Sequence, residues 1–184
     1  MALSPQTEAA AIAPEPIHTT LYCIRHGIAA ERGTLANDDD RPLVEKGRQR
    51  TAQVAQRLKT LGITFDHVLT SPLVRAQQTA EILQAEGLTP AIAVCADLAP
   101  DGDLKAWLGW LADWQAQHPQ GTVAIVGHEP DLSRWAQVLV AGLTAAGDRW
   151  ELKKAGIIGL WVPRADRAIG QSELFWLTPP RLIL

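Results

Sequence analysis

Two arginines and two histidines of this chain have residue types and positions that could do chemistry together; they are Arg25, His26, Arg75 and His128. The planar guanidinium of arginine binds the oxygens of a phosphate-like anion, and its charge does not titrate. Histidine is the side chain that acts as nucleophile or proton carrier near neutral pH. Neighbouring arginine charges disfavour the imidazolium form of a histidine, so a ring nitrogen stays free for attack. The set predicts a site that binds a tetrahedral oxyanion.

These residues follow three apolar segments that share one pattern, an apolar run and then a sharp polar turn. The segments are residues 21–27, 68–75 and 123–130. Each apolar run predicts a strand, and the carboxyl ends of strands collect the ligand in open α/β sheets. Helices are expected to begin at Pro72, behind Ser71 as N-cap, and at Pro130. Because free backbone N–H groups at helix starts favour an anion, the three turns are expected to converge on one site.

Hydrophobic periodicity predicts the elements that position these turns. Strands are expected over residues 19–24, 65–70, 91–95, 122–126, 157–162 and 173–177, and helices over residues 44–61, 72–86, 103–117 and 130–140. Because strands and helices alternate through most of the chain, the predicted fold is an α/β three-layer sandwich, with a mostly parallel central sheet and helices on both faces. The last two strands lack an intervening helix and are expected to form an antiparallel edge.

One domain is expected over residues 19–184, preceded by a flexible tail over residues 1–18 that is rich in Ala and Pro. Leu61 is expected on the buried face of the helix over residues 44–61. The tryptophans at 107 and 114 recur at helical spacing, which predicts a buried helix face rather than a platform for a ligand.

The composition of the 184 residues excludes several classes of protein. With 47% hydrophobic and 20% charged residues the chain is typical of a globular domain. A net charge of −3 argues against nucleic acid or an anionic membrane as the main partner, and no apolar run reaches the length of a membrane span. The two cysteines, Cys23 and Cys95, are expected to be buried thiols, and without histidines at ligand spacing they predict no zinc site. The start of the chain is not typical of a signal peptide, so we expect a cytoplasmic protein.

Three motifs carry a resemblance to a known family. Leu-Tyr-Cys-Ile-Arg-His-Gly at 21–27, Ser-Pro-Leu-Val-Arg-Ala-Gln-Gln-Thr-Ala at 71–80 and Val-Gly-His at 126–128 resemble signatures of the histidine phosphatase superfamily, the phosphoglycerate mutase-like fold. Their order and spacing agree from residue 20 to about residue 178. Arg-Pro-Leu at 41–43 with Gly47, Leu-Ala-Pro at 98–100 with Gly-Asp at 102–103, and the short interval from Arg75 to His128 resemble the SixA-like phosphohistidine phosphatases.

The resemblance implies a mechanism that needs no metal or cofactor. His26 would attack phosphorus and become a phosphohistidine, while Arg25, Arg75 and His128 would hold the phosphoryl oxygens. The function expected is a phosphohistidine protein phosphatase, whose partner is a phosphorylated protein of the histidine-containing phosphotransfer type. A phosphomonoesterase of the same mechanism acting on a small phosphate ester is the alternative, followed by a non-catalytic phosphate-binding module.

The proton donor for the leaving group is left open by the sequence. Asp101 and Asp103 are candidate general acids, as are Glu129 and the aspartates at 38–40, although each aspartate of that run is also typical of a solvated loop. Arg41 is either a further phosphate ligand or an ion pair that anchors its loop.

Lys153 and Lys154 precede a predicted strand. They are expected to form its solvated start, or else to attract an acidic protein partner.

Overall fold

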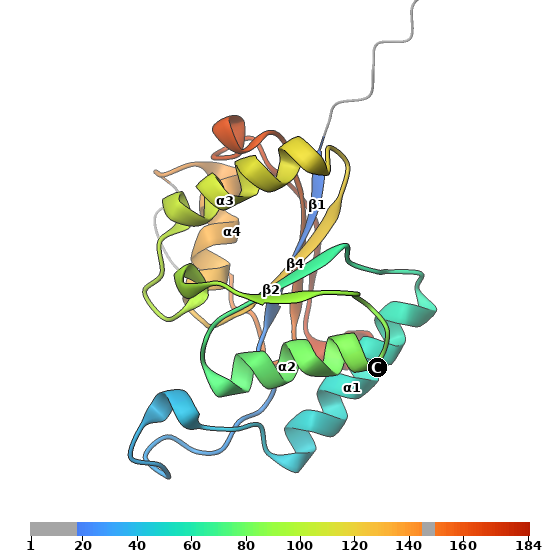
Figure 1. Cartoon of the computed structure of the whole chain (residues 1–184), viewed down its shortest axis with the longest axis vertical. Coiled ribbons are helices and arrows are strands. Elements are labelled where there is room, and N and C mark those ends of the chain that lie inside the picture. Colours follow the sequence, from blue (N-terminus) through green and yellow to red (C-terminus); the bar gives the residue numbers. More distant parts are fainter. Residues whose placement is uncertain (1–17, 145–149) are drawn as a thin grey trace, which may run out of the picture.

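A central six-stranded sheet lies between two layers of helices in the computed structural model, which describes residues 18–144 and 150–184 (Figure 1). The strands are β1 (Thr19–Arg25), β2 (His67–Thr70), β3 (Ile92–Val94), β4 (Thr122–Gly127), β5 (Ile157–Val162) and β6 (Glu173–Thr178). The helices are α1 (Glu45–Thr60), α2 (Val74–Ala85), α3 (Leu104–Gln117) and α4 (Asp131–Ala141). Of the expected tail, only His18 belongs to the described residues.

The strand order is β3-β2-β4-β1-β5-β6. The first four strands in this order pair in parallel, whereas β5 is antiparallel to β1 and β6 is antiparallel to β5. The predicted three-layer sandwich, its mostly parallel sheet and its antiparallel edge are therefore confirmed.

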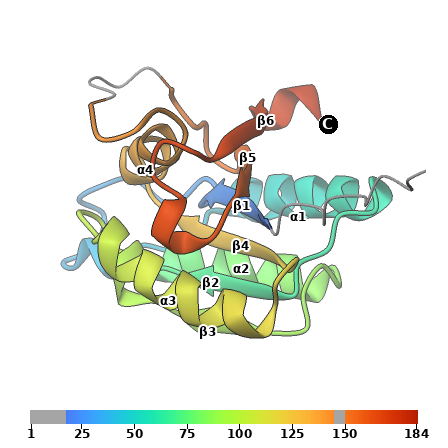
Figure 2. The same ribbon diagram turned by 90° about the horizontal axis from the view of Figure 1, so that it is seen from above.

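Helices α1 and α2 cover one face of the sheet and α3 and α4 cover the other (Figure 2), and each face carries its own core. One core contains Val54 and Leu58 of α1 with Leu83 of α2, and the other contains side chains of α3 and α4. Trp107 and Trp114 are buried in the second core, which confirms the predicted stripe. Leu61, expected on the buried face, is 48% exposed, because α1 ends at Thr60 and Leu61 lies beyond its last turn.

The register of the sheet aligns the strand ends that carry the predicted site. Ile24 of β1 and Thr70 of β2 both pair with Val126 of β4, so the residues that follow these three strands emerge side by side. Convergence of the three turns therefore follows from the parallel pairing.

The helices that follow β2 and β4, α2 and α4, begin two residues and one residue later than expected. The hydroxyl of Ser71 accepts a hydrogen bond from the N–H of Leu73 at 3.3 Å, which forms a turn before α2 begins at Val74 rather than a cap on Pro72. Likewise α4 begins at Asp131, with Pro130 as its N-cap residue. Because α2 begins at Val74, Arg75 lies in its first turn, as expected.

Both cysteines are free thiols; Cys23 is buried, whereas Cys95, beside the short edge strand β3, is only half-buried. Within residues 18–144 and 150–184, no helix combines the length and apolarity that crossing a bilayer requires.

Candidate active site

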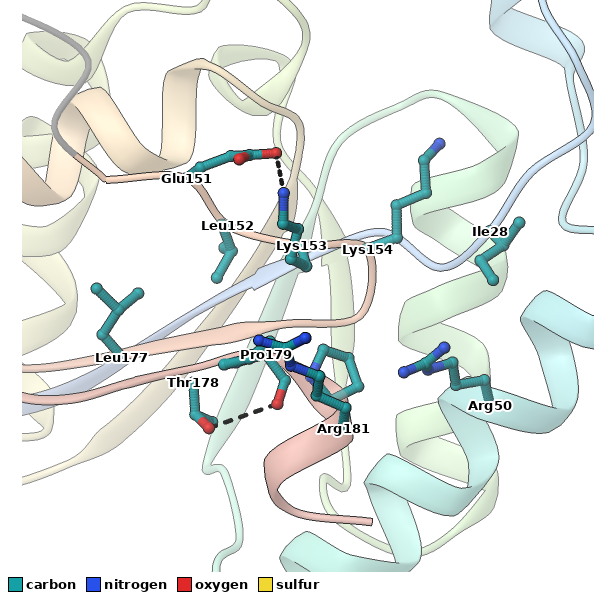
Figure 3. Close-up of a pocket in the computed structure, with 11 residues that line it drawn as sticks. Ile28, Arg50, Glu151, Leu152, Lys153, Lys154, Leu177, Thr178, Pro179 and Arg181 are labelled. Atoms are coloured by element: carbon teal, nitrogen blue, oxygen red, sulfur yellow. Dashed lines mark hydrogen bonds and ion pairs between the residues drawn. The ribbon is translucent and has the colours of Figure 1, made fainter.

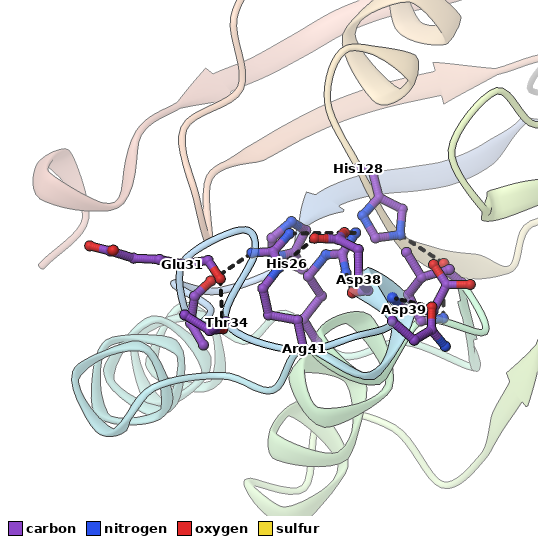
Figure 4. Close-up of polar contacts among 12 residues, drawn as sticks. His26, Glu31, Thr34, Asp38, Asp39, Arg41 and His128 are labelled. Carbon is purple, nitrogen blue, oxygen red and sulfur yellow. Dashed lines mark hydrogen bonds and ion pairs between the residues drawn. The ribbon is translucent and has the colours of Figure 1, made fainter.

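The ends of β1, β2 and β4 bring two histidines to the base of a cavity of about 480 Å³. The rings of His26 and His128 are 5.1 Å apart between centroids, and each residue is at most 5% exposed. Arg25, Arg41 and Arg75 line the same cavity. Figure 4 shows the two imidazoles with Asp38 and Arg41 beside them. The structure thus brings together the four predicted residues and Arg41.

The hydrogen bond of the His26 ring determines which nitrogen is free. Nδ1 lies 2.7 Å from the carbonyl oxygen of Gly27, which can only accept, so Nδ1 carries the hydrogen and Nε2 keeps its lone pair. Burial, followed by the charges of His128, Lys154 and Arg75, lowers the pKa of His26 to about 2 despite the opposing effect of the Gly27 hydrogen bond. The imidazole is therefore neutral, held so by burial more than by the arginines, and its Nε2 lone pair is available for nucleophilic attack.

His128 is held by a residue that the sequence analysis treated only as a helix cap. Its Nε2 lies 2.8 Å from the hydroxyl oxygen of Ser71, which is fully buried at the end of β2. Burial, together with the charges of Arg75, Arg25 and Arg41, lowers the pKa of His128 to about 3. A neutral His128 at this place can bind a phosphoryl oxygen and exchange a proton with the Ser71 hydroxyl.

Three of the four arginines that line the cavity are each fixed by a backbone carbonyl. Arg25 donates to the oxygen of Leu152 at 2.7 Å, Arg41 to that of Ala30 at 2.8 Å and Arg75 to that of Asp38 at 2.9 Å. The Nε atoms of Arg25 and Arg75 are buried without a hydrogen-bond partner. Fixed guanidinium groups with donors to spare suit a phosphoryl group and the charge that it develops during transfer.

Asp38 links two of these arginines. Its carboxylate accepts from Arg41 at 2.9 and 3.2 Å and lies 3.3 Å from Nη2 of Arg75. The Arg41 hydrogen bond is the largest cause that lowers the pKa of Asp38. Arg41 therefore anchors its loop through an ion pair, which is one of its two expected roles, and it also lines the cavity. The neighbouring Asp39 and Asp40 are exposed.

Asp101 and Asp103, the expected general acids, do not line the cavity. The carboxylate of Asp103 accepts from the N–H groups of Lys105 and Ala106 at 2.8 and 3.3 Å, because α3 begins at Leu104 and needs an N-cap there. Asp101 is exposed, and its backbone N–H donates to the carboxylate of Asp131. The structure thus corrects the expected position of both residues.

Glu129 is the carboxyl group that does line the cavity. It is half-buried and accepts a hydrogen bond from the Ser133 hydroxyl at 2.8 Å. Burial raises the pKa of Glu129, partly opposed by the Ser133 hydrogen bond and the charge of Arg25. A carboxyl group whose protonated form is favoured in this way can act as a proton donor.

Lys154 also lines the cavity, so its expected place at a solvated strand start is wrong. Because β5 is antiparallel to β1, the start of β5 lies beside the end of β1, and Ala155 donates its N–H to the carbonyl oxygen of Arg25 at 3.0 Å. Burial and the charges of the nearby arginines lower the pKa of Lys154. Lys153 is exposed as expected and pairs with Glu151.

The turn after His26 is built around close backbone approaches to α1. A Cβ atom at Gly27 would lie 2.5 Å from the hydroxyl oxygen of Thr51, and one at Gly47 would lie 2.0 Å from the carbonyl oxygen of Ile28. The N–H of Gly27 also donates to the hydroxyl of Thr79 at 3.0 Å. Glycine at 27 and 47 therefore lets the turn after His26 pack closely against α1 and α2.

Comparison with known proteins agrees with this geometry. Residues 21–99 match the family model of the histidine phosphatase superfamily (branch 1). An uncharacterized protein of Picosynechococcus is 52% identical over 165 residues, which are 89% of this chain and 98% of that protein. A probable phosphoglycerate mutase GpmB of Cronobacter sakazakii is 50% identical over 66 residues, only 34% of this chain and 29% of that one.

Solved structures show the same fold. The structure of the protein histidine phosphatase SixA complexed with tungstate aligns with a TM-score of 0.76 and 24% identity, and it covers 90% of this chain and 99% of that one.

Proposed function

Because the chain belongs to the histidine phosphatase superfamily, we propose that it is a phosphatase that removes phosphate from phosphohistidine on a protein, with His26 as the covalent acceptor. The observation that carries the proposal is the neutral imidazole of His26, whose Nδ1–H is held by Gly27 and whose Nε2 is free at the base of a cavity lined by arginines.

The proposed reaction has two displacements at phosphorus. Nε2 of His26 forms a bond to phosphorus while the P–N bond of the substrate breaks, and the departing imidazole keeps the electron pair and takes up a proton. Water then attacks the phosphorus of the phosphorylated enzyme, the bond to His26 breaks, and inorganic phosphate leaves. Arg25, Arg75 and His128 stabilise the phosphoryl oxygens in both steps.

A protein-borne phosphohistidine fits the surroundings of the cavity. Glu31 and Arg32, at the start of the exposed segment 31–40, line the cavity, and in the described part of the chain the residues after β2 and β4 lead within three residues into α2 and α4. A side chain on a protein surface can therefore approach His26. Two free thiols agree with a reducing compartment, so a cytoplasmic location is part of the proposal.

The test is the release of phosphate from a phosphorylated histidine-containing phosphotransfer protein, beside a sugar phosphate and an aryl phosphate. We expect rapid release from the phosphoprotein and slow turnover of the sugar phosphate, whose alkoxide is a poor leaving group. Brisk turnover of small esters with no release from the phosphoprotein would overturn the proposal.

The second candidate is a phosphomonoesterase for small molecules, favoured by the position of Glu129. A carboxyl group with a raised pKa at the cavity wall can protonate a departing alkoxide, and phosphohistidine, which leaves more easily, has a weaker need for such a donor. The same substrate panel separates the two candidates, since only this one predicts efficient turnover of sugar phosphates.

A further inference from the structure

A second cavity of about 500 Å³ lies next to the catalytic cavity, and Ile28 and Lys154 line both. Its other walls come from α1, from the segment before β5, and from the end of β6 with the turn Pro180–Leu182 that follows. Figure 3 shows the side chains that surround it. None of the sequence motifs lies in this second cavity, and the proposed phosphoryl transfer does not use it.

The two arginines of this cavity lack, among the described residues, the partners that ordinarily neutralise such groups. In Figure 3, Arg50 of α1 and Arg181 of the final turn extend into the cavity from different elements. Within the described ranges neither guanidinium has a hydrogen bond or an ion pair, and the Nε atom of Arg50 is buried without a partner. Lys153, by contrast, is paired with Glu151.

The two cavities together form a cationic cleft in a chain whose net charge is −3. Eight arginine and lysine side chains line them, against three glutamates. Arg50 is half-buried, and a guanidinium that has lost water at Nε without gaining an acceptor is unfavourable, so an incoming anion relieves that cost. Arg181 is exposed and adds a second positive charge that is free to turn toward the same anion. Leu152, Leu177 and Pro179 supply an apolar surface beside these charges, which suits the carbon skeleton that carries such an anion.

We propose that the second cavity is an accessory anion subsite. It binds a carboxylate or phosphate group on the same molecule whose phosphoryl group enters the catalytic cavity, with Arg50 and Arg181 as its ligands and Lys154 between the two anions. This inference rests on the proposed phosphatase function, because the subsite would bind a second negatively charged group of the substrate of that reaction. That charge comes either from an acidic side chain near the phosphohistidine of a protein or from a second acidic group on a small phosphate ester.

The test compares substrates with and without the second charge. Phenyl phosphate, a phenyl phosphate that bears a carboxyalkyl chain, and a phosphorylated histidine-containing phosphotransfer protein are assayed with wild type and with the double variant Arg50→Gln/Arg181→Gln. We expect the preference of wild type for a doubly anionic substrate over phenyl phosphate, measured as a ratio of kcat/KM, to fall about 10-fold in the variant. The change is expected in KM, and added salt should reduce it.

The arms of the test identify the source of the anion. A loss confined to the phosphoprotein assigns the site to an acidic side chain of a protein, and a loss confined to the carboxyalkyl ester assigns it to a small molecule. Equal effects on all three substrates, or no effect on any, would overturn the subsite. Absence of release from the phosphoprotein would refute only the proposed function, because the two phenyl phosphates still test the subsite.

Two controls keep a folding defect from being mistaken for loss of the subsite. Arg50→Lys/Arg181→Lys retains the charges and should keep most of the preference, whereas Arg164→Gln removes an exposed arginine paired with Asp166 and should leave the ratio at its wild-type value. Calorimetric binding of the carboxyalkyl ester to His26→Ala protein, with and without the Arg50 and Arg181 substitutions, gives a readout that requires no turnover. We expect about 10-fold weaker binding with them, and equal affinities would refute the subsite.

Discussion

The two adjoining cavities are alike in volume and in sign of charge, but they differ in how their cations are held. In the catalytic cavity Arg25, Arg41 and Arg75 each donate to a backbone carbonyl, so the guanidinium groups are fixed before a ligand arrives. In the second cavity Arg50 and Arg181 have no such bond among the residues described. The first arrangement is preorganised for a transition state, and the second is suited to binding alone.

Replacing His26 should have the largest effect on activity, because the second cavity offers no residue that can take its place as nucleophile. His26→Ala is expected to lower kcat by about 10⁴-fold or more, as loss of a covalent catalyst does. An acid-labile phosphoenzyme, trapped by quenching a reaction with labelled substrate, should appear in wild type and be absent from the variant. Full activity in His26→Ala would refute the covalent mechanism.

Exchanging an arginine for lysine in each cavity tests whether the two cavities differ in how strictly they require fixed guanidinium geometry. Arg75→Lys keeps the charge but loses the planar fork and its bond to the carbonyl oxygen of Asp38, so kcat should fall about 10²- to 10³-fold for every phosphate substrate. Arg50→Lys should cost at least tenfold less, since no fixed geometry is lost there. Steady-state kinetics on one aryl phosphate decides the matter, and equal losses would show that the two cavities work as one.

Glu129→Gln asks whether the catalytic cavity supplies a proton as well as charge. Turnover of a sugar phosphate should fall about 10²-fold, whereas phosphohistidine, with its better leaving group, should be affected far less. In wild type the rate on the sugar phosphate should fall as pH rises through the raised pKa of Glu129, because the protonated acid is the donor. The pH–rate profile of the variant should lack that decline. An unchanged profile would exclude Glu129 as the acid.

Asp38→Asn should have the smallest effect of these variants, and it should strengthen phosphate binding where the others lower activity. A bound phosphate competes with the Asp38 carboxylate for Arg75 and Arg41, so removing this partly exposed charge should tighten inhibition by inorganic phosphate about two- to fivefold at low salt. Asp39→Asn, at an exposed neighbour, is the control. Weaker inhibition would show instead that Asp38 positions the arginines.

Local patterns were enough to predict the part of the site that stands on strand ends. The apolar runs before His26 and His128 predict strands, parallel strands end at one edge, and the two histidines consequently meet. The presence of Arg75 at the site was predicted from its place in the first turn of a helix. Helix and strand bounds differ from prediction by no more than two residues, and the largest differences are at the starts of β2 and α2; before α2, Ser71 forms a turn instead of a cap.

The residues that the sequence analysis missed or misplaced depend on packing between distant segments. Lys154 reaches the cavity because β5 runs antiparallel to β1, a pairing that the predicted antiparallel edge of the last two strands did not specify. The bridge from Asp38 to Arg75 spans 37 positions and leaves no periodic signal. Asp103 was a reasonable acid by position, yet the same position before a helix is one where a carboxylate serves as a cap.

The place of β1 in the middle of the sheet has a consequence for the rates at which parts of this pocket open. Hydrogen bonds from β4 and β5 hold β1 on both sides, so its amides should be among the last in the molecule to exchange with deuterated solvent. The exposed residues 31–40, of which Glu31 and Arg32 line the cavity, should exchange among the first. His26, at the end of β1, is therefore expected to move on the slowest timescale of the fold. Residues 31–40 are expected to rearrange many times within the same interval.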